Sequence, residues 1–159
     1  MKHFRVGTGY DVHQLKNNNK LILGGVLIPH YKGTVAHSDG DVVIHAICDA
    51  LLGAAGLGDI GHFFPDNDNN FKDIDSKILL KDVFKMIQQK NFFVVNVDVS
   101  IVLEVPKLKN YLLDMKTQIS KCINISVNDI NIKATTSEKL GFIGREEGVA
   151  CYATTLIAC

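Results

Sequence analysis

The segment 95–104 alternates apolar and polar residues, which restricts it to a β-strand with one buried face. Its apolar positions are Val95, Val97, Val99, Ile101 and Leu103. We also expect strands over 3–10, 130–134 and 149–157, and helices over about 39–55, from Ser76, and over about 109–123. This mixed order predicts an α/β (α+β) fold: one mixed β-sheet with helices on one face and the other face left for subunit packing.

Composition excludes some classes of protein. The 159 residues fit a single domain, expected to span 1–159. Lys+Arg and Asp+Glu are balanced at 17 each, so no broad field favours nucleic acid or an acidic membrane surface. No apolar run is long enough for a membrane span, and we expect no signal peptide. The four cysteines have no C-x-x-C spacing, so we expect reduced thiols and a reducing compartment.

Three further segments have recognisable local chemistry. Residues 21–28 predict a hairpin that turns at Gly24-Gly25, and Ser38 or Asp39 is the expected cap of the first helix. Residues 56–75 are rich in Gly, Asp and Asn, and we expect a long loop there.

Asp11, His13 and His45 are candidate metal ligands. Alternate strand residues share a face, so Asp11 and His13 point the same way, while His45 lies on the polar face of the first helix. Two imidazoles and one carboxylate suit an open zinc site, whose fourth position is left for water or substrate. Asp49, one turn after His45, is a candidate acceptor that fixes the histidine tautomer. The structural alternatives are a hydrogen-bonded core histidine and an Asp49 that pairs with a surface lysine.

Three segments are candidates for binding a phosphorylated, hydroxylated ligand. Residues 37–40 precede a helix N-terminus, where free N–H groups favour phosphate, but an ordinary capping turn explains them equally well. Residues 135–138 are either a helix cap or a hydroxyl-rich phosphate clasp in which Glu138 binds Mg²⁺. Residues 58–68 form a Gly-rich acidic loop that suits a polyol, or else a solvated turn. His3, His30 and His62 have no convincing partners and are treated as surface residues.

Taken together, these segments resemble the 2-C-methyl-D-erythritol 2,4-cyclodiphosphate synthase family of the non-mevalonate isoprenoid pathway. The resemblance covers nearly the whole chain, and the ordered set of motifs is highly specific although no single motif is. Its motifs are the following residues: 9–13, 36–41 with His45, 51–55, 58–61, 64–66, 96–98, 106–108, 133–136, 138–142, and 144–145 with 147–148.

The resemblance implies a homotrimer with a fold similar to Bacillus chorismate mutase and active sites between neighbouring subunits. It implies Zn²⁺ on Asp11, His13 and His45, and Mg²⁺ or Mn²⁺ on Glu138. It assigns catalytic roles to His37, Asp59 and Thr136. The implied phosphate contacts are His37 and Ser38, and the implied methylerythritol contacts are Asp59 and Gly61 with Phe64, Asp66 and Asp68 of the same loop. The implied cytidine diphosphate pocket, on the adjacent subunit, consists of Pro106, Lys107, Leu108, Ala134, Thr135 and Thr136. Phe142 and Arg145, with Glu147, are implied to surround a central cavity for an isoprenoid diphosphate.

The implied reaction is a metal-assisted cyclisation by a phosphorus–oxygen lyase. The 2-phosphate of 4-diphosphocytidyl-2-C-methyl-D-erythritol 2-phosphate attacks the β-phosphorus and releases CMP. The alternatives are a zinc-dependent phosphoesterase and a non-catalytic trimeric metabolite-binding protein. Leu103 stands where many family members carry a small residue, and Ser137 replaces a commoner threonine, but neither change touches the metal triad.

The same resemblance leaves two compartments open. The family occurs in bacteria and plastids, and this chain is rich in Asn, Lys and Ile with Arg5 and Arg145 as its arginines. We expect the cytoplasm if the source is bacterial, and an apicoplast-like plastid stroma if it is eukaryotic.

Overall fold

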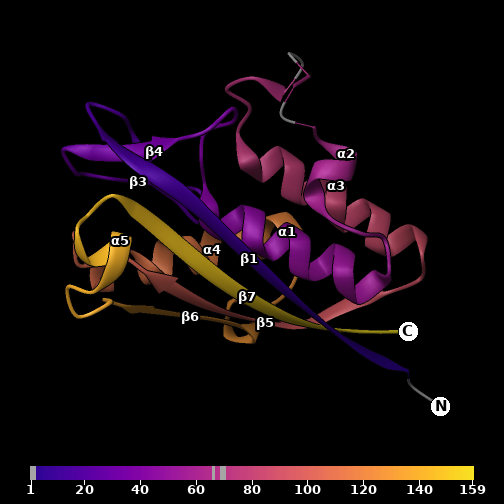
Figure 1. The fold of residues 1–159 in the computed structure, drawn as a ribbon. Coiled ribbons are helices and arrows are strands. Elements are labelled where there is room, and N and C mark those ends of the chain that lie inside the picture. Colours follow the sequence, from indigo (N-terminus) through magenta and orange to yellow (C-terminus); the bar gives the residue numbers. More distant parts are fainter. Residues whose placement is uncertain (1–2, 66, 69–70) are drawn as a thin grey trace.

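A computed structural model describes residues 3–65, 67–68 and 71–159 (Figure 1). Its main sheet has five strands in the order β4-β1-β7-β5-β6, and every neighbouring pair is antiparallel except the parallel pair β5–β6. The strands are β1 (Phe4–Asn17), β4 (Lys32–Val35), β5 (Phe93–Val102), β6 (Ile130–Thr135) and β7 (Gly148–Ala158). The predicted mixed sheet is therefore confirmed.

Three long helices cover one face of this sheet. They are α1 (Val42–Ala55), α3 (Ser76–Gln89) and α4 (Leu112–Ile123), the last preceded by a 3-10 turn at Lys109–Tyr111. Helix α1 packs on β1 and β7, α3 packs on α1, and α4 contacts β6. The short elements are α2 (Ile60–Phe63), α5 (Gly141–Gly144) and a 3-10 turn at Val127–Asp129.

Helix α1 carries much of the core, and its start differs from the prediction. The N-cap is Asp41, neither Ser38 nor Asp39, and its carboxylate accepts hydrogen bonds from the N–H groups of Val43 and Ile44. The same carboxylate also accepts the N–H groups of Gly24 and Gly25 in the hairpin turn. Asp41 is fully buried, so its carboxylate both caps the N-terminus of α1 and joins the helix to the hairpin.

Two glycines bring β1 unusually close to α1. A Cβ atom at Gly7 would lie 2.0 Å from the carbonyl oxygen of Ala50, and one at Gly9 would lie 2.0 Å from that of Ala46. Only glycine fits such an approach of strand and helix backbones. The next residues on the same face of β1 are Asp11 and His13, so this close packing brings both toward His45 on α1.

The structure extends and corrects the predicted element list. The first strand continues to Asn17, so Asp11 and His13 lie inside it and not at its end. The hairpin is confirmed as β2 (Leu21–Leu23) and β3 (Val26–Ile28), but it forms a separate two-stranded sheet. Strand β4 was not predicted, and α2 lies inside the segment expected to be a loop.

The face of the sheet away from the helices carries exposed apolar side chains. On β1 these are Phe4, Val6, Tyr10 and Val12, and Tyr152 on β7 joins them with its ring 4.8 Å from that of Tyr10. Val6 is 65% exposed and Tyr152 is 55% exposed. A contiguous apolar surface of this kind is typical of a protein–protein interface.

Two other expectations concern the chain as a whole. Across the described residues, no helix has the length and apolar character needed to cross a membrane. All four cysteines are free thiols; Cys48, Cys122 and Cys151 are buried, and Cys159 is exposed.

Candidate metal centre and substrate site

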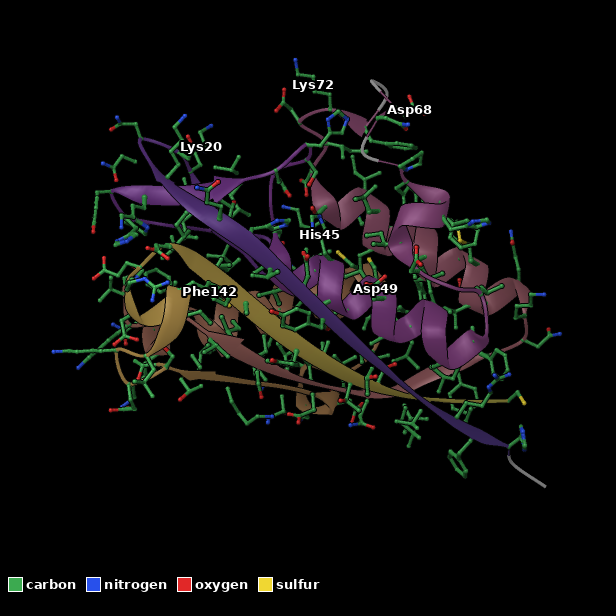
Figure 2. All side chains as sticks on the ribbon, in the orientation of Figure 1. Lys20, His45, Asp49, Asp68, Lys72 and Phe142 are labelled. Carbon is green, nitrogen blue, oxygen red and sulfur yellow. The ribbon has the colours of Figure 1, made fainter. Side chains whose placement is uncertain are left out.

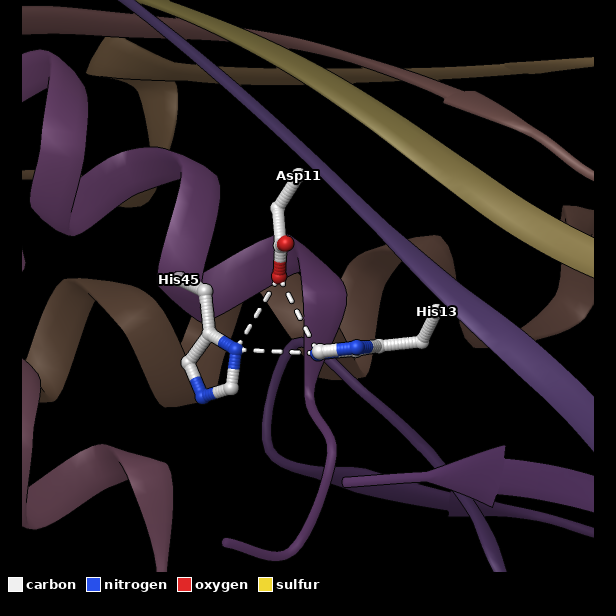
Figure 3. A group of neighbouring side chains, drawn as sticks. All are labelled: Asp11, His13 and His45. Carbon is white, nitrogen blue, oxygen red and sulfur yellow. Dashed lines mark hydrogen bonds and ion pairs between the residues drawn. The ribbon is translucent and has the colours of Figure 1, made fainter. Parts of the chain in front are cut away.

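Asp11, His13 and His45 converge on one point, as the sequence predicted (Figure 3). The Oδ2 atom of Asp11 lies 3.0 Å from Nδ1 of His45 and 3.1 Å from Nε2 of His13. The two imidazole nitrogens lie 3.1 Å apart. Among the described residues, this is the one group of three ligating side chains close enough to share a metal ion.

The triangle fits one face of a zinc tetrahedron. Nitrogen and oxygen ligands at 2.0–2.1 Å from Zn²⁺ are separated by about 3.3 Å in tetrahedral geometry. The observed edges of 3.0 to 3.1 Å are close to that value. Because three protein ligands leave the fourth position free, the donor set suits a metal that binds a substrate phosphate.

The electrostatics of the triad favour an ionised carboxylate. Burial would raise the pKa of Asp11, but hydrogen bonds from His13 and His45 and the charges of these rings outweigh burial and leave that pKa well below its usual range. Burial would lower the pKa of His45, but the hydrogen bond to Asp11 and the charges of Asp11, Asp41 and Asp39 outweigh it and raise that pKa. A cation at this point would replace the imidazole proton and be attracted by the same carboxylates.

The remaining nitrogen of His45 has a partner that differs from the predicted one. Its Nε2 lies 2.9 Å from Oγ of Ser76 and 3.2 Å from Oγ of Ser38. Asp49 instead accepts the N–H of Ile60 at 2.7 Å and so fixes the start of α2, although it lies one turn from His45 (Figure 2). The expectations that Asp49 orients His45 or pairs with a lysine are both wrong, because the N-terminus of α2 uses its carboxylate.

The triad opens into a cavity of about 590 Å³. His37, Ser38, Gly61 and Phe64, which the resemblance links to the substrate, also line this cavity. Ile60, Pro65 and Asn67 of the predicted 58–68 loop, together with Ala36 and Asp49, also line the cavity, and the lining residues that were not predicted are Phe71, Ile74 and Leu79. The rings of Phe64 and Phe71 meet edge to face with centroids 5.4 Å apart, so one wall of the cavity is apolar.

The remaining predicted residues near this cavity have mainly structural contacts. His37 Nε2 lies 2.9 Å from the backbone oxygen of Asp68, so this ring connects the 37–40 turn to the loop across the cavity. Asp59 caps α2 by accepting the N–H of His62 and is itself exposed. Asp66 lies outside the described residues.

The residues linked to a nucleotide lie at the ends of β5 and β6. Ala134, Thr135 and Thr136 are exposed, whereas Leu108 is only 3% exposed, so a ligand would reach Leu108 through its backbone. Pro106 is partly buried and Lys107 is exposed on the connection that follows β5.

Glu138 lies in a turn and not in the first turn of a helix. Both Glu138 and Lys139 have positive φ, and Thr136 Oγ1 donates to Glu138 Oε1 at 3.0 Å. The capping interpretation of residues 135–138 is therefore wrong, because the chain turns back toward α5 and no long helix follows. An exposed carboxylate beside hydroxyl groups is suited to Mg²⁺, which takes few protein ligands and completes its shell with water and phosphate.

The metal triad and the nucleotide residues are separated within one chain. Strand register aligns Asp11 with Cys151, Cys151 with Ile101, and Ile101 with Ala134. Three strand spacings put Ala134 about 14 Å from Asp11 across the sheet. Cys151 and Ile101 between them are fully buried, and the cavity beside the triad is lined by none of residues 106–108 or 134–136. Phe142 lies on α5, away from His45 (Figure 2), and Arg145 follows α5; both are exposed and neither lines the cavity.

Comparison with known proteins identifies the family of this chain. A model of the YgbB family matches residues 4–158. The chain belongs to the YgbB family. Curated 2-C-methyl-D-erythritol 2,4-cyclodiphosphate synthases from Fusobacterium nucleatum and Prosthecochloris aestuarii are 54% and 53% identical to it over 153 residues. These matches cover 96% of this chain and 96% and 98% of the two relatives.

Solved structures agree with the fold. The bifunctional IspDF of Campylobacter jejuni superposes with a TM-score of 0.96 at 42% identity over 99% of this chain, which spans 43% of that longer protein. A CDP complex of IspF from Plasmodium falciparum has a TM-score of 0.85 at 38% identity, covering 97% of this chain and 95% of that one. The resemblance seen in the motifs is confirmed, and so is the predicted enzyme class, a cyclising lyase.

Proposed function

We propose that this protein converts 4-diphosphocytidyl-2-C-methyl-D-erythritol 2-phosphate to 2-C-methyl-D-erythritol 2,4-cyclodiphosphate and CMP, as a single synthase domain spanning residues 1–159. The observation that carries the proposal is the triangle of Asp11, His13 and His45 in the lining of a cavity that is also lined by His37 and Ser38. The names of the curated relatives support the choice of substrate and product.

The reaction exchanges one phosphorus–oxygen bond for another. An oxygen of the 2-phosphate bonds to the β-phosphorus, and the bond from that phosphorus to the bridging oxygen breaks. CMP leaves with the electron pair and takes a proton from solvent. Because two anions must approach each other, positioning and charge neutralisation are the main requirements, and no covalent enzyme intermediate is needed.

The chain supplies these requirements from two sides. Asp11, His13 and His45 would hold Zn²⁺, and Glu138 would hold Mg²⁺ or Mn²⁺; bound there, the metals supply Lewis-acid stabilisation of phosphate charge. Ser38 and the turn at 37–40 bind phosphate next to the triad, while Asp59 and Gly61 bind the hydroxyl groups of the methylerythritol. Thr136 donates a hydrogen bond to the diphosphate, and residues 106–108 and 134–136 bind the cytidine.

A complete site requires two subunits. The buried residues Cys151 and Ile101 separate the triad from Ala134 within one chain, so one bound nucleotide would have to cross a packed core. We therefore propose the homotrimer of the chorismate mutase-like architecture, in which the triad of one chain faces the β5–β6 ends of the next. The apolar sheet face around Tyr10 and Tyr152 supports this assembly, because it offers a surface for the neighbouring chains.

Two finer assignments complete the proposal. Phe142 and Arg145 surround the trimer axis, where an apolar ring beside a guanidinium group suits an isoprenoid diphosphate.

The bacterial relatives favour the cytoplasm of a bacterium, while the Plasmodium neighbours keep a plastid stroma as the eukaryotic alternative.

Phosphorus NMR tests the reaction directly. Incubation of the purified protein with the substrate, Zn²⁺ and Mg²⁺ is expected to yield CMP and a cyclic diphosphate in equal amounts. In water enriched with ¹⁸O, the cyclic product is expected to contain no solvent oxygen. A linear product that carries ¹⁸O would favour a zinc phosphoesterase, and tight binding without CMP release would favour a metabolite-binding protein. The curated relatives favour neither alternative.

Mixed trimers test whether the site lies between subunits. His45→Ala and Glu138→Gln are each expected to lose nearly all activity when prepared alone. Unfolded, mixed in equal amounts and refolded together, they would restore about a quarter of the sites, because each shared site draws its two halves at random from two chains. If the site lay within one chain, every chain would still carry a defect and mixing would restore nothing. Tyr152→Asp is expected to break the trimer, which light scattering would detect.

A further inference from the structure

Ser76 connects the metal ligand His45 to a carboxylate on another segment. Its Oγ lies 2.9 Å from Nε2 of His45. The same hydroxyl donates a hydrogen bond to Oδ1 of Asp39. Ser76 is completely buried at the start of α3, whereas His45 belongs to α1 and Asp39 to the turn before it. Three elements therefore meet in one chain of hydrogen bonds beside the triad.

Asp39 is held in place independently of His45. Its Oδ2 accepts the N–H of Ser76 at 3.0 Å, and its Oδ1 also accepts the N–H of Asp41 at 3.2 Å. The first N–H groups of a helix have no partner inside the helix, so Asp39 satisfies one such group of α3 from a distant segment. These contacts orient the carboxylate toward the Ser76 hydroxyl before any ligand binds.

The number of protons in this chain of hydrogen bonds determines which nitrogen of His45 is available for the metal. A hydroxyl has one proton, and Ser76 donates it to Asp39, so the Ser76 oxygen can only accept from His45. Nε2 must then be the donor, so in the neutral ring, the form that can bind a metal, the lone pair is on Nδ1. Nδ1 is the atom that lies 3.0 Å from Asp11 and 3.1 Å from His13. Ser38 Oγ, 3.2 Å from Nε2, is a second acceptor for the same N–H.

We propose that Asp39 and Ser76 form a relay that keeps Nε2 of His45 protonated and its Nδ1 directed at the metal position, so that Ser76 is a positioning residue of the metal centre. The inference rests on the proposed function, because it takes the triad to be a zinc site. Hydrogen-bond partners of this kind set the tautomer, orientation and basicity of metal-bound histidines. Through the relay, the orientation of the metal ligand His45 also depends on the positions of α3 and of the 37–40 turn.

Zinc affinity measured against a chromophoric chelator tests the relay without substrate. Ser76→Ala is expected to weaken zinc binding about 10- to 100-fold. Ser76→Thr keeps the hydroxyl and is expected to recover most of the affinity, while Asp39→Asn removes the charged acceptor and is expected to weaken binding as well. The matched control is Thr155→Val, which removes another fully buried hydroxyl, one with no hydrogen-bond partner among the described residues. This control is expected to bind zinc like the parent.

Three further measurements separate positioning from general damage. Thermal unfolding of each metal-free variant identifies loss of fold. In the zinc-loaded, ¹⁵N-labelled parent, the Nε2–H proton of His45 is expected to exchange slowly with water, and in Ser76→Ala it is expected to exchange faster. Cobalt-substituted Ser76→Ala is expected to show an altered ligand-field spectrum.

The outcomes distinguish the relay from the proposed function. If the parent binds zinc and Ser76→Ala, still folded, binds it equally well with unchanged proton exchange, the relay is wrong and the synthase proposal stands. If the parent binds no zinc, the metal centre of the proposed function fails and the relay fails with it. Weaker binding in both Ser76→Ala and Asp39→Asn, with recovery in Ser76→Thr, supports the relay.

Discussion

The two halves of the candidate site differ in how far a single chain completes them. The metal half is assembled within one subunit: β1 lies against α1 at Gly7 and Gly9, and three ligating atoms lie within 3.1 Å of one another. The nucleotide half consists of exposed residues at and beyond the ends of β5 and β6. There the Glu138 carboxylate accepts a hydrogen bond from Thr136, a residue of the same turn. Folding alone therefore brings the three candidate metal ligands together, whereas the proposed function requires a second subunit to complete the site.

The largest expected effect comes from removing a ligand in the metal half. His45→Ala is expected to lower kcat/KM on the order of 10³-fold or more, because a Lewis acid supplies several kcal/mol of transition-state stabilisation. Zinc content, measured by atomic absorption, is expected to fall together with activity while the trimer persists. His3→Ala removes an exposed imidazole at the other end of β1 and is the matched control. Near-normal turnover in His45→Ala would refute the triad.

A smaller effect is expected in the nucleotide half. Glu138→Gln removes the charge that would hold Mg²⁺ and is expected to lower kcat on the order of 10²-fold, comparable to losing one electrostatic contact to the transition state. Zinc content is expected to stay at the parent level, because no ligand of the triad has changed. Loss of zinc in Glu138→Gln would contradict the division into two halves.

Local patterns predicted most of the scaffold and the ligands themselves. The alternation over residues 95–104 and the buried stripe of the first helix depend on neighbouring residues, and both elements formed with shifted bounds, as β5 (Phe93–Val102) and α1 (Val42–Ala55). Asp11, His13 and His45 were recognisable because strand and helix periodicity places each side chain on a known face. The nucleotide residues were assigned by resemblance, because nothing in their local chemistry indicates a base or a ribose.

Contacts between distant segments determined what the sequence could not predict. Ser38, Asp39 and Asp41 are all plausible caps, and Asp41 is used because the hairpin turn at Gly24 and Gly25 donates to its carboxylate. Strand β4 has no alternation of its own and forms by pairing with residues 14–17 of β1. Ser76 could be identified as a helix start, but its contact with His45 spans 31 positions and has no local signal.

The cap at Asp41 gives a stability test confined to the metal half. Burial raises the pKa of Asp41 to about 6, so at neutral pH the group is ionised and accepts four N–H groups. Asp41→Asn replaces one accepting carboxylate oxygen with an NH₂ group, so the buried N–H groups bound to that oxygen lose their acceptor. The substitution is expected to lower the free energy of unfolding by about 3 kcal/mol. Denaturant unfolding at neutral pH measures the change. Asp98→Asn, which alters an exposed pair with Lys133, is the control and is expected to cost less than about 1 kcal/mol.

The smallest effect is a pH dependence that belongs to the metal half alone. The pKa of His45 is raised in the metal-free protein, so zinc must displace a proton from this ring at any pH below the raised value. The protonated His45–Asp11 pair stabilises the metal-free protein below the ordinary imidazole pKa, and this stabilisation is lost as the pH rises through the raised value. Zinc affinity is therefore expected to increase with pH by about tenfold per unit over that window, and then to level off. Asp11 adds nothing to this slope, because its lowered pKa keeps it ionised throughout. The increase in melting temperature on adding zinc, measured at a series of pH values, is expected to grow along the same curve. A zinc-induced increase that is flat across this window would mean that zinc displaces no proton from His45 and would refute this pH dependence.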